Sequence, residues 1–516
     1  MLNIGLKMET VFKIIKRNQY IVFVGLLILI HLLLNNYPDY KITGFNILTY
    51  KYLFVSLFSI SIFIGLFYIV KTYYKKLDKI FYYTFFVYFI VLFIYSLLFY
   101  PAGSSPDTIV MIHSIEKLVI ANAYPNTYLL YGSLLWLTST LYVVTFVQII
   151  LISFMFAYFM SFCSNFISLK FLFFINLFFL LNPLFWQYGV YLHNNVVTNY
   201  SILFLGIFLF KALIENTLIK KQSISIVCAL SFLIGLARGE AIVIPFISLF
   251  IYIFYVYKNS FSIGYKLKTL SFLLLTIFIT FLFKINYDRY KDYHYNAFLY
   301  ENIITSIMSN SKFNTHNKKL DSKIISYYGT LDYPYKQKED KNKQVWAYRQ
   351  YISSYDISTI KKQKELAVAL LLDYPFIYLK NQLIIFDKAN QQKFFLGNYF
   401  DNTPSFSSRY WSKKQHAPKR PDINNLTYTE KYNIGFIYKN MLYVGFIILL
   451  TSILFYRYNP YTALISTLFL SSKLLVFVSA WDFYFMQQLL LYYAIPIIPL
   501  MAWIEMKKRK KLDINV

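Results

Sequence analysis

Apolar runs of about 15 to 21 residues recur along this chain, separated by short breaks that carry lysine. A helix that crosses a bilayer needs about 20 mainly apolar residues, so runs of this length predict membrane spans. We expect about twelve spans, near residues 20–34, 52–70, 80–100, 141–161, 171–186, 196–213, 223–237, 241–257, 268–284, 437–456, 461–480 and 486–504. The predicted fold class is therefore an all-α polytopic membrane protein.

The pattern changes between residues 285 and 436, where the chain becomes polar and rich in tyrosine and lysine. At about 150 residues, this segment has the size of a domain. It predicts an external domain, mainly α-helical and irregular, between a membrane region at 1–284 and a second membrane region at 437–516 that ends in a basic tail. Within it, Glu365–Leu372 and Phe376–Phe386 have the pattern of short amphipathic helices, which we interpret as lying on the membrane surface.

The composition favours a membrane protein over a soluble one. Apolar residues make up 58% of the chain and charged residues 15%, whereas soluble chains carry about 25% charged residues. The two cysteines, Cys163 and Cys228, lie in or beside apolar runs, which argues against a disulfide scaffold or a thiolate metal site. With 15 glycines and 14 prolines, few of the spans are expected to be broken.

The net charge of +27 does not indicate nucleic-acid binding, because the positions of the basic residues depend on the predicted spans. They gather in alternate connections, including Lys7 to Arg17, Lys71 to Lys79 and the tail Lys507 to Lys511. By the positive-inside rule, that side is cytoplasmic. We therefore expect both termini in the cytoplasm and the polar domain outside. The excess of lysine, asparagine, isoleucine, phenylalanine and tyrosine is typical of an adenine- and thymine-rich bacterial genome, so the plasma membrane is the expected location.

Asp107 is a candidate catalytic residue, because placing an ionisable group at the membrane edge costs free energy and so indicates a functional role. It lies in the predicted external segment Tyr100-Pro-Ala-Gly-Ser-Ser-Pro-Asp-Thr108, ahead of an amphipathic helix whose polar face carries His113 and Glu116. One interpretation is structural: the preceding serine and proline suit a helix start, and the carboxylate complements the helix dipole. The other is catalytic, with Asp107 taking a proton from an acceptor hydroxyl.

Three more predicted external segments contain polar residues that could bind a substrate. They contain Tyr124, then His193, Asn194 and Asn195, then Arg238 and Glu240. The tyrosine precedes a proline in an aromatic segment that is also typical of an interfacial belt. The histidine and the two asparagines could hydrogen-bond a sugar or cap helix ends. The arginine and glutamate form either a local ion pair or a phosphate site, in which the guanidinium presents a planar fork.

The order of short motifs resembles that of the C-type glycosyltransferase superfold (GT-C). The motifs are Tyr100-Pro101 with Pro106-Asp107, then Tyr124-Pro125, then Arg238-Gly-Glu240. These polytopic enzymes use polyisoprenyl-phosphate sugars outside the cytoplasmic membrane. The resemblance, over about residues 80 to 390, implies inverting transfer to a glycan, lipid or protein acceptor of the cell envelope. It implies Asp107 as the general base and basic groups on the leaving phosphate, with the candidate residues in one cleft.

The sequence leaves two other classes of function open. A polymerase or ligase of surface polysaccharide would also use a basic external domain, but its chemistry relies on arginine, which is scarce here beside lysine. A flippase or transporter would want ionisable residues within its spans. His31 and Lys473 are the nearest of these, and we interpret both as snorkelling or capping residues. The sequence identifies no cofactor and no metal ligand set, and it leaves the use of a divalent metal open.

Overall fold

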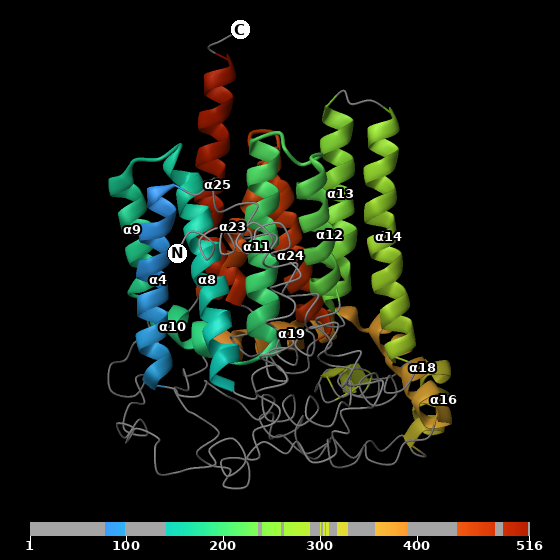
Figure 1. Ribbon diagram of the computed structural model, residues 1–516. Helices are drawn as coiled ribbons and strands as arrows, with labels where there is room; N and C mark the ends of the chain where they lie inside the picture. The colour runs from blue at the N-terminus through green and yellow to red at the C-terminus, as the bar shows by residue number, and fades with distance from the viewer. Residues whose placement is uncertain are drawn as a thin grey trace, which may run out of the picture. The chain divides into compact units, whose positions relative to one another are not determined.

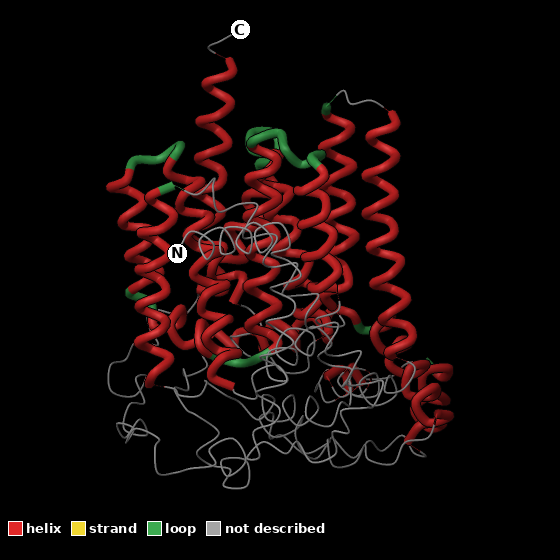
Figure 2. The backbone as a smooth tube through the Cα atoms, viewed as in Figure 1, coloured by secondary structure: helices red, strands yellow, loops and turns green. Residues whose placement is uncertain are grey.

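Every secondary-structure element among the described residues is helical (Figure 2). The computed structural model describes residues 78–98, 141–235, 240–259, 263–288, 300, 303–304, 306–308, 317–328, 357–390, 441–479 and 489–513. No β-strand occurs in these ranges, in agreement with the predicted all-α class. The spans predicted at 20–34 and 52–70 lie outside the described residues.

The chain forms two compact units. The first is Met1–Val197 with Phe395–Thr427, and the second is Thr198–Phe394 with Tyr428–Val516. The described helices of the first unit are α4 (Lys79–Leu98), α8 (Leu141–Ser164), α9 (Leu169–Leu180) and α10 (Pro183–Val190). The helix α11 (Asn194–Ile214) begins at the end of the first unit and continues into the second.

The core of the first unit is aromatic. Tyr88 of α4 is fully buried and stacks on Phe156 of α8, with ring centroids 5.1 Å apart, while Phe185 of α10 meets it edge to face at 5.3 Å. Gln148 of α8 donates from Nε2 to the carbonyl oxygen of Gly189 at 2.9 Å, which satisfies a carbonyl at the end of α10 inside the unit. Ring packing and a buried amide therefore hold α4, α8 and α10 together.

The stretch predicted as one span at 171–186 forms two helices instead of a single one. A break separates α9 from α10, whose first residue is Pro183, and proline lacks the N–H that would continue the helical hydrogen bonds. The carbonyl of Asn182 accepts instead from the N–H groups of Phe185 and Trp186, at 3.1 and 3.4 Å. With 12 and 8 residues, these helices rise about 18 and 12 Å, well short of the roughly 30 Å core of a bilayer.

The second unit holds the remaining described helices. They are α12 (Lys221–Gly235), the 3-10 helix η4 (Glu240–Ile242), α13 (Val243–Lys258), α14 (Ile263–Asp288), α16 (Lys318–Tyr328), α18 (Ile357–Asp373), α19 (Pro375–Asn390), α23 (Met441–Leu454), α24 (Pro460–Ser479) and α25 (Leu489–Asp513). Within this unit α12, α13 and α14 pack on one another, as do α23, α24 and α25, and α13 contacts α24 (Figure 1). Each span predicted in the second unit overlaps a described helix.

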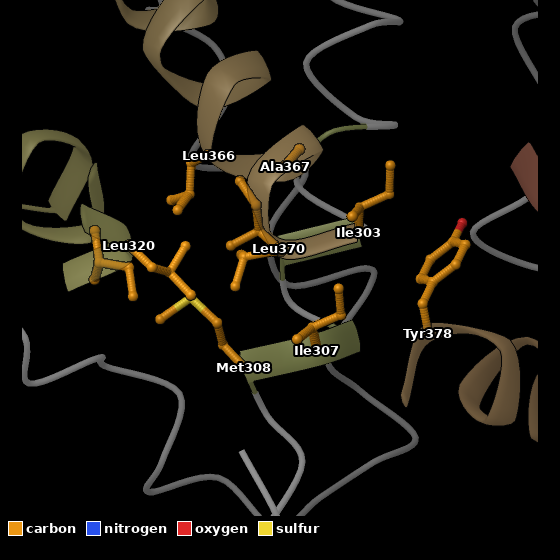
Figure 3. Packing of buried hydrophobic residues seen from close by; sticks show 10 residues of the cluster. Ile303, Ile307, Met308, Leu320, Leu366, Ala367, Leu370 and Tyr378 are labelled. Atoms are coloured by element: carbon orange, nitrogen blue, oxygen red, sulfur yellow. The ribbon is translucent and has the colours of Figure 1, made fainter. Parts of the chain in front are cut away.

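The predicted helices at Glu365–Leu372 and Phe376–Phe386 are present as parts of α18 and α19. Together with α16 and a short segment around Ile307, they enclose a small apolar core of their own (Figure 3). Asn381 of α19 donates from Nδ2 to the carbonyl oxygen of Ser306, which ties α19 to this core. The predicted external segment thus contains a packed helical group.

Four described helices are long and apolar enough to cross a membrane. They cover Lys79–Leu97, Val143–Ser164, Asn195–Ile214 and Leu489–Lys510. Large apolar side chains are also exposed on several helices, among them Tyr83 of α4, Phe174 of α9 and Phe278 of α14. Surfaces of this kind suit lipid better than water, so the structure agrees with the predicted membrane protein.

Candidate functional site

Lys473 is a buried ionisable residue in the apolar helix α24. The residue is only 5% exposed, and its Nζ donates to Oδ1 of Asn199 on α11 at 2.5 Å. Asn199 is buried as well. Because a charge inside a membrane helix bundle is costly, an ionisable residue that a specific partner holds there is a candidate for function.

A pair of tyrosines lies one residue further along α11, about 100° around the helix from Asn199. Tyr200 follows Asn199 in α11, and its hydroxyl shares a hydrogen bond of 2.6 Å with the hydroxyl of Tyr493 on α25. Both tyrosines are buried, and their ring centroids lie 5.5 Å apart. This hydrogen bond joins α11 to α25. We call Asn199, Tyr200, Lys473 and Tyr493 the lysine layer.

The lysine layer lies near one end of its three helices. α24 and α25 run antiparallel, since Glu505 near the end of α25 bonds to the start of α24. At 1.5 Å per residue, Asn199 and Tyr493 lie about 6 to 8 Å after the first residues of their helices, and Lys473 lies about 9 Å before the last residue of α24. These are the helix ends that the sequence predicts to face outward.

α11 and α24 approach each other closely next to the lysine layer. Ile465, Phe469 and Lys473 recur every four residues and share one face of α24. Gly206 of α11 meets that face: a Cβ atom at this position would lie 2.4 Å from the Phe469 ring and 3.2 Å from Ile465. The glycine therefore allows the two helices to pack near enough for the lysine to reach Asn199.

Glu505 of α25 fixes the opposite end of α24. Its buried carboxylate accepts from the backbone N–H groups of Tyr461 and Thr462 at 3.1 and 2.9 Å, and from the Thr462 hydroxyl at 2.9 Å. N–H groups in the first turn of a helix have no partner within that helix. Glu505 thus caps α24 from a neighbouring helix, and it fixes the axial position of α24, and with it Lys473, relative to α25.

Most residues that the sequence proposes for the site lie outside the described part of the chain. These are Asp107, His113, Glu116, Tyr124 and Arg238. Two more are described by their backbone: Asn194 is the first residue of α11, and Glu240 begins η4. The convergence of the candidates on one cleft therefore stays a prediction.

His193 lies just before α11, in the first unit, and is buried. Its ring nitrogen Nδ1 accepts from the backbone N–H of Asn195 at 3.1 Å, and its carbonyl oxygen accepts from the N–H of Val197 at 3.2 Å. Contacts of this kind cap a helix start, which is the structural alternative for this loop. Sugar binding by His193, Asn194 and Asn195 stays a prediction.

The interpretation of Lys473 as a snorkelling or capping residue is wrong. The lysine is buried, and its contact with Asn199 joins residues 274 positions apart in the chain. The sequence does contain a signal, since Lys473 is an ionisable residue well inside the span predicted at 461–480. Spacing along the chain could not reveal its partner.

In the described part of the chain, no group of three or more His, Cys, Asp or Glu side chains is placed to hold a metal ion. Comparison of the chain with protein-family models, with curated proteins and with solved structures finds no match. Its function is therefore to be inferred from its own residues.

Proposed function

We propose that this chain is a membrane glycosyltransferase, which moves a sugar from a polyisoprenyl-phosphate donor to a cell-envelope glycan, lipid or protein. The lysine layer carries the proposal, because it offers a cation, an amide and two phenols at one depth among apolar helices. A lipid phosphate has an anionic head on an apolar tail. It therefore matches a buried cation in an apolar bundle.

The proposal includes the predicted topology, with about twelve spans, cytoplasmic termini and an external domain over 285–436 in the plasma membrane. In that arrangement, the lysine layer lies in the outer half of the membrane. The phosphate of a lipid-linked sugar reaches this depth from the outer leaflet.

The proposed transfer joins the acceptor oxygen to the anomeric carbon of the sugar and breaks the bond from that carbon to the phosphate oxygen. The bonding electrons leave with the polyisoprenyl phosphate, and the acceptor proton passes to the Asp107 carboxylate. Negative charge grows on the phosphate as the bond breaks, so fixed cations favour the transition state over the ground state. We assign that role to Arg238 and Lys473.

The test is transfer of radiolabelled sugar from a polyisoprenyl-phosphate donor, in proteoliposomes that hold equal amounts of each variant. Asp107→Asn keeps shape and capping but removes basicity, so transfer should fall by roughly two to four orders of magnitude. Lys473→Met keeps length but removes charge and should cost about 100-fold. Lys473→Arg should retain more activity than Lys473→Met. Near-normal transfer by both Asp107→Asn and Lys473→Met would overturn the proposal.

A lipid-linked oligosaccharide transporter is the second candidate. The buried Lys473 favours it, because transporters place ionisable residues within their spans. A transporter would move labelled lipid-linked oligosaccharide between the two leaflets of a proteoliposome without breaking the glycosidic bond. Movement without sugar transfer, lost in Lys473→Met, would select this function. A polysaccharide polymerase or ligase would instead require a lipid-diphosphate oligosaccharide donor, so both kinds of donor belong in the assay.

A further inference from the structure

The helix α19 turns Tyr378 into the apolar core but leaves several of its large apolar side chains exposed. Tyr378 and Gln382 are buried, and the half-buried Asn381 bonds to the backbone of Ser306. Phe376, by contrast, is 82% exposed. A surface helix in water buries its apolar stripe, whereas Phe376, Leu379 and Leu383 of this helix are all exposed. Such a helix suits a surrounding that is itself apolar.

The exposed apolar face of α19 is continuous in sequence with the end of α18. It consists of Leu372, Phe376, Leu379, Leu383 and Ile384, which are all exposed. We call these five residues the exposed apolar face. Tyr374 lies at the turn between the two helices, where burial, followed by the nearby Asp373 and Asp321 carboxylates, raises the pKa of its phenol. A neutral phenol among apolar side chains is typical of membrane interfaces.

The charged residues of the same helices are mainly lysines. α16, α18 and α19 carry eight lysines and four acidic residues. Lys361 and Lys362 are exposed near the start of α18, about 15 Å along the helix from Leu372. Lys380 is exposed next to the exposed apolar face, and its long stem can carry the ammonium to water. The helix pair therefore changes from a basic end to a mainly apolar end.

The direction of α19 also distinguishes it from the long apolar helices. It contacts α24, but in Figure 1 it runs across the direction of α24 and α25. If α25 crosses a membrane, as its length and composition allow, α19 lies roughly along the plane of that membrane.

We propose that the α18 and α19 pair is a membrane-interface anchor, whose exposed apolar face lies at the boundary between headgroups and acyl chains. Its lysines then contact anionic headgroups. This anchor fixes the polar external segment against the bilayer next to α24. The proposal does not depend on sugar transfer, and it would hold equally for a transporter.

A second copy of the chain is the competing occupant of the exposed apolar face. In a two-fold contact, the same patch meets itself, so the lysine surplus of one copy would oppose that of the other. Anionic lipid has the opposite charge and an apolar layer beneath it. The combination of apolar side chains with lysine therefore favours lipid.

Spin labels on the full chain in nanodiscs that contain anionic lipid test this placement. Labels are introduced as Phe376→Cys and Leu383→Cys, with Lys362→Cys as a matched control on α18, after Cys163 and Cys228 are replaced by alanine. Accessibility is measured to oxygen, which concentrates in lipid, and to a polar nickel chelate, which stays in water. We expect Phe376→Cys and Leu383→Cys to favour oxygen at a depth of about 5 to 10 Å, and Lys362→Cys to favour the chelate.

Three outcomes would overturn the proposal. Chelate accessibility at Phe376→Cys and Leu383→Cys like that at Lys362→Cys would mean an aqueous surface. Protection from both reagents, with dipolar broadening between labels, would mean a contact between copies. Protection without broadening would mean that another part of the chain covers the face. Sugar transfer by the labelled proteins, measured in parallel, reports on the other proposal separately.

Discussion

Lys473 and Asn199 form a buried contact whose strength can be measured by a double-mutant cycle. Asn199→Leu takes away an acceptor from a buried ammonium, which should lower the free energy of unfolding by about 1 to 3 kcal/mol. In a Lys473→Met background, the same change should cost much less, so a coupling of at least about 1 kcal/mol is expected. Thermal unfolding in detergent measures all four proteins.

Ser466 supplies the control for this cycle. It is buried on the same helix, and its Oγ has no hydrogen-bond partner. Ser466→Ala should therefore cost little and show no coupling with Lys473→Met. Equal coupling for Ser466 and Asn199 would mean that the loss of packing in α24, and not the bond, determines the result.

Glu505 should stabilise the protein through the backbone of α24. Glu505→Ala leaves N–H groups of the first turn without an acceptor and should cost about 1 to 3 kcal/mol of unfolding free energy. Glu505→Gln keeps one oxygen and should cost less. Arg509→Gln is the control, because Arg509 approaches the same carboxylate only at 3.4 Å and is partly exposed, so its loss should stay below about 1 kcal/mol. If Arg509→Gln destabilises as much as Glu505→Ala, an ion pair and not the cap is the main contact.

The close contact between α11 and α24 depends on Gly206 having no side chain. Gly206→Ala places a methyl group against the Phe469 ring and should cost about 1 to 3 kcal/mol, because the helices must separate. A second change, Phe469→Leu, should recover much of that loss by making room. Gly264→Ala in α14 is the control, since no atom lies within 4 Å of its Cβ position, and alanine favours a helix. Unfolding temperatures in detergent compare the four proteins, and equal losses at Gly206 and Gly264 would contradict the close-packing explanation.

The positions of the helices could be predicted from the sequence because they depend on local pattern. The sequence predicts separate helices before and after Pro375 from the pattern of apolar residues, and the structure contains both, as α18 and α19. The split between α9 and α10 at Pro183 was missed, although the residue type is the same. There the apolar run continues through the proline, so length alone predicted one span.

The lysine layer could not be predicted from the sequence, because it is built by residues far apart in the chain. The contact between Lys473 and Asn199 spans 274 positions, and that between Tyr200 and Tyr493 spans 293. Hydrophobic pattern identifies which segments are helices but not which faces meet. Only the packing of α11, α24 and α25 in the second unit brings an asparagine, two tyrosines and a lysine to one depth.

The orientation of the chain in the membrane determines in which half of the bilayer the lysine layer lies. Lys220 precedes α12 and Lys318 follows α14, and the three packed helices α12, α13 and α14 lie between them in sequence. If each of the three crosses the membrane, these two exposed lysines lie on opposite sides. The predicted topology places Lys220 in the cytoplasm and Lys318, with Ser353 of the same polar segment, outside.

Cysteine labelling of intact cells measures this directly, in a chain whose Cys163 and Cys228 are replaced by alanine. A membrane-impermeant maleimide should label Lys318→Cys and Ser353→Cys in intact cells, and Lys220→Cys only after the membrane is broken. The reverse pattern would place the lysine layer in the cytoplasmic half of the membrane, where an external acceptor cannot reach it, and sugar transfer on the outer face would be excluded. Labelling of all three in intact cells would mean that α12, α13 and α14 do not produce three crossings.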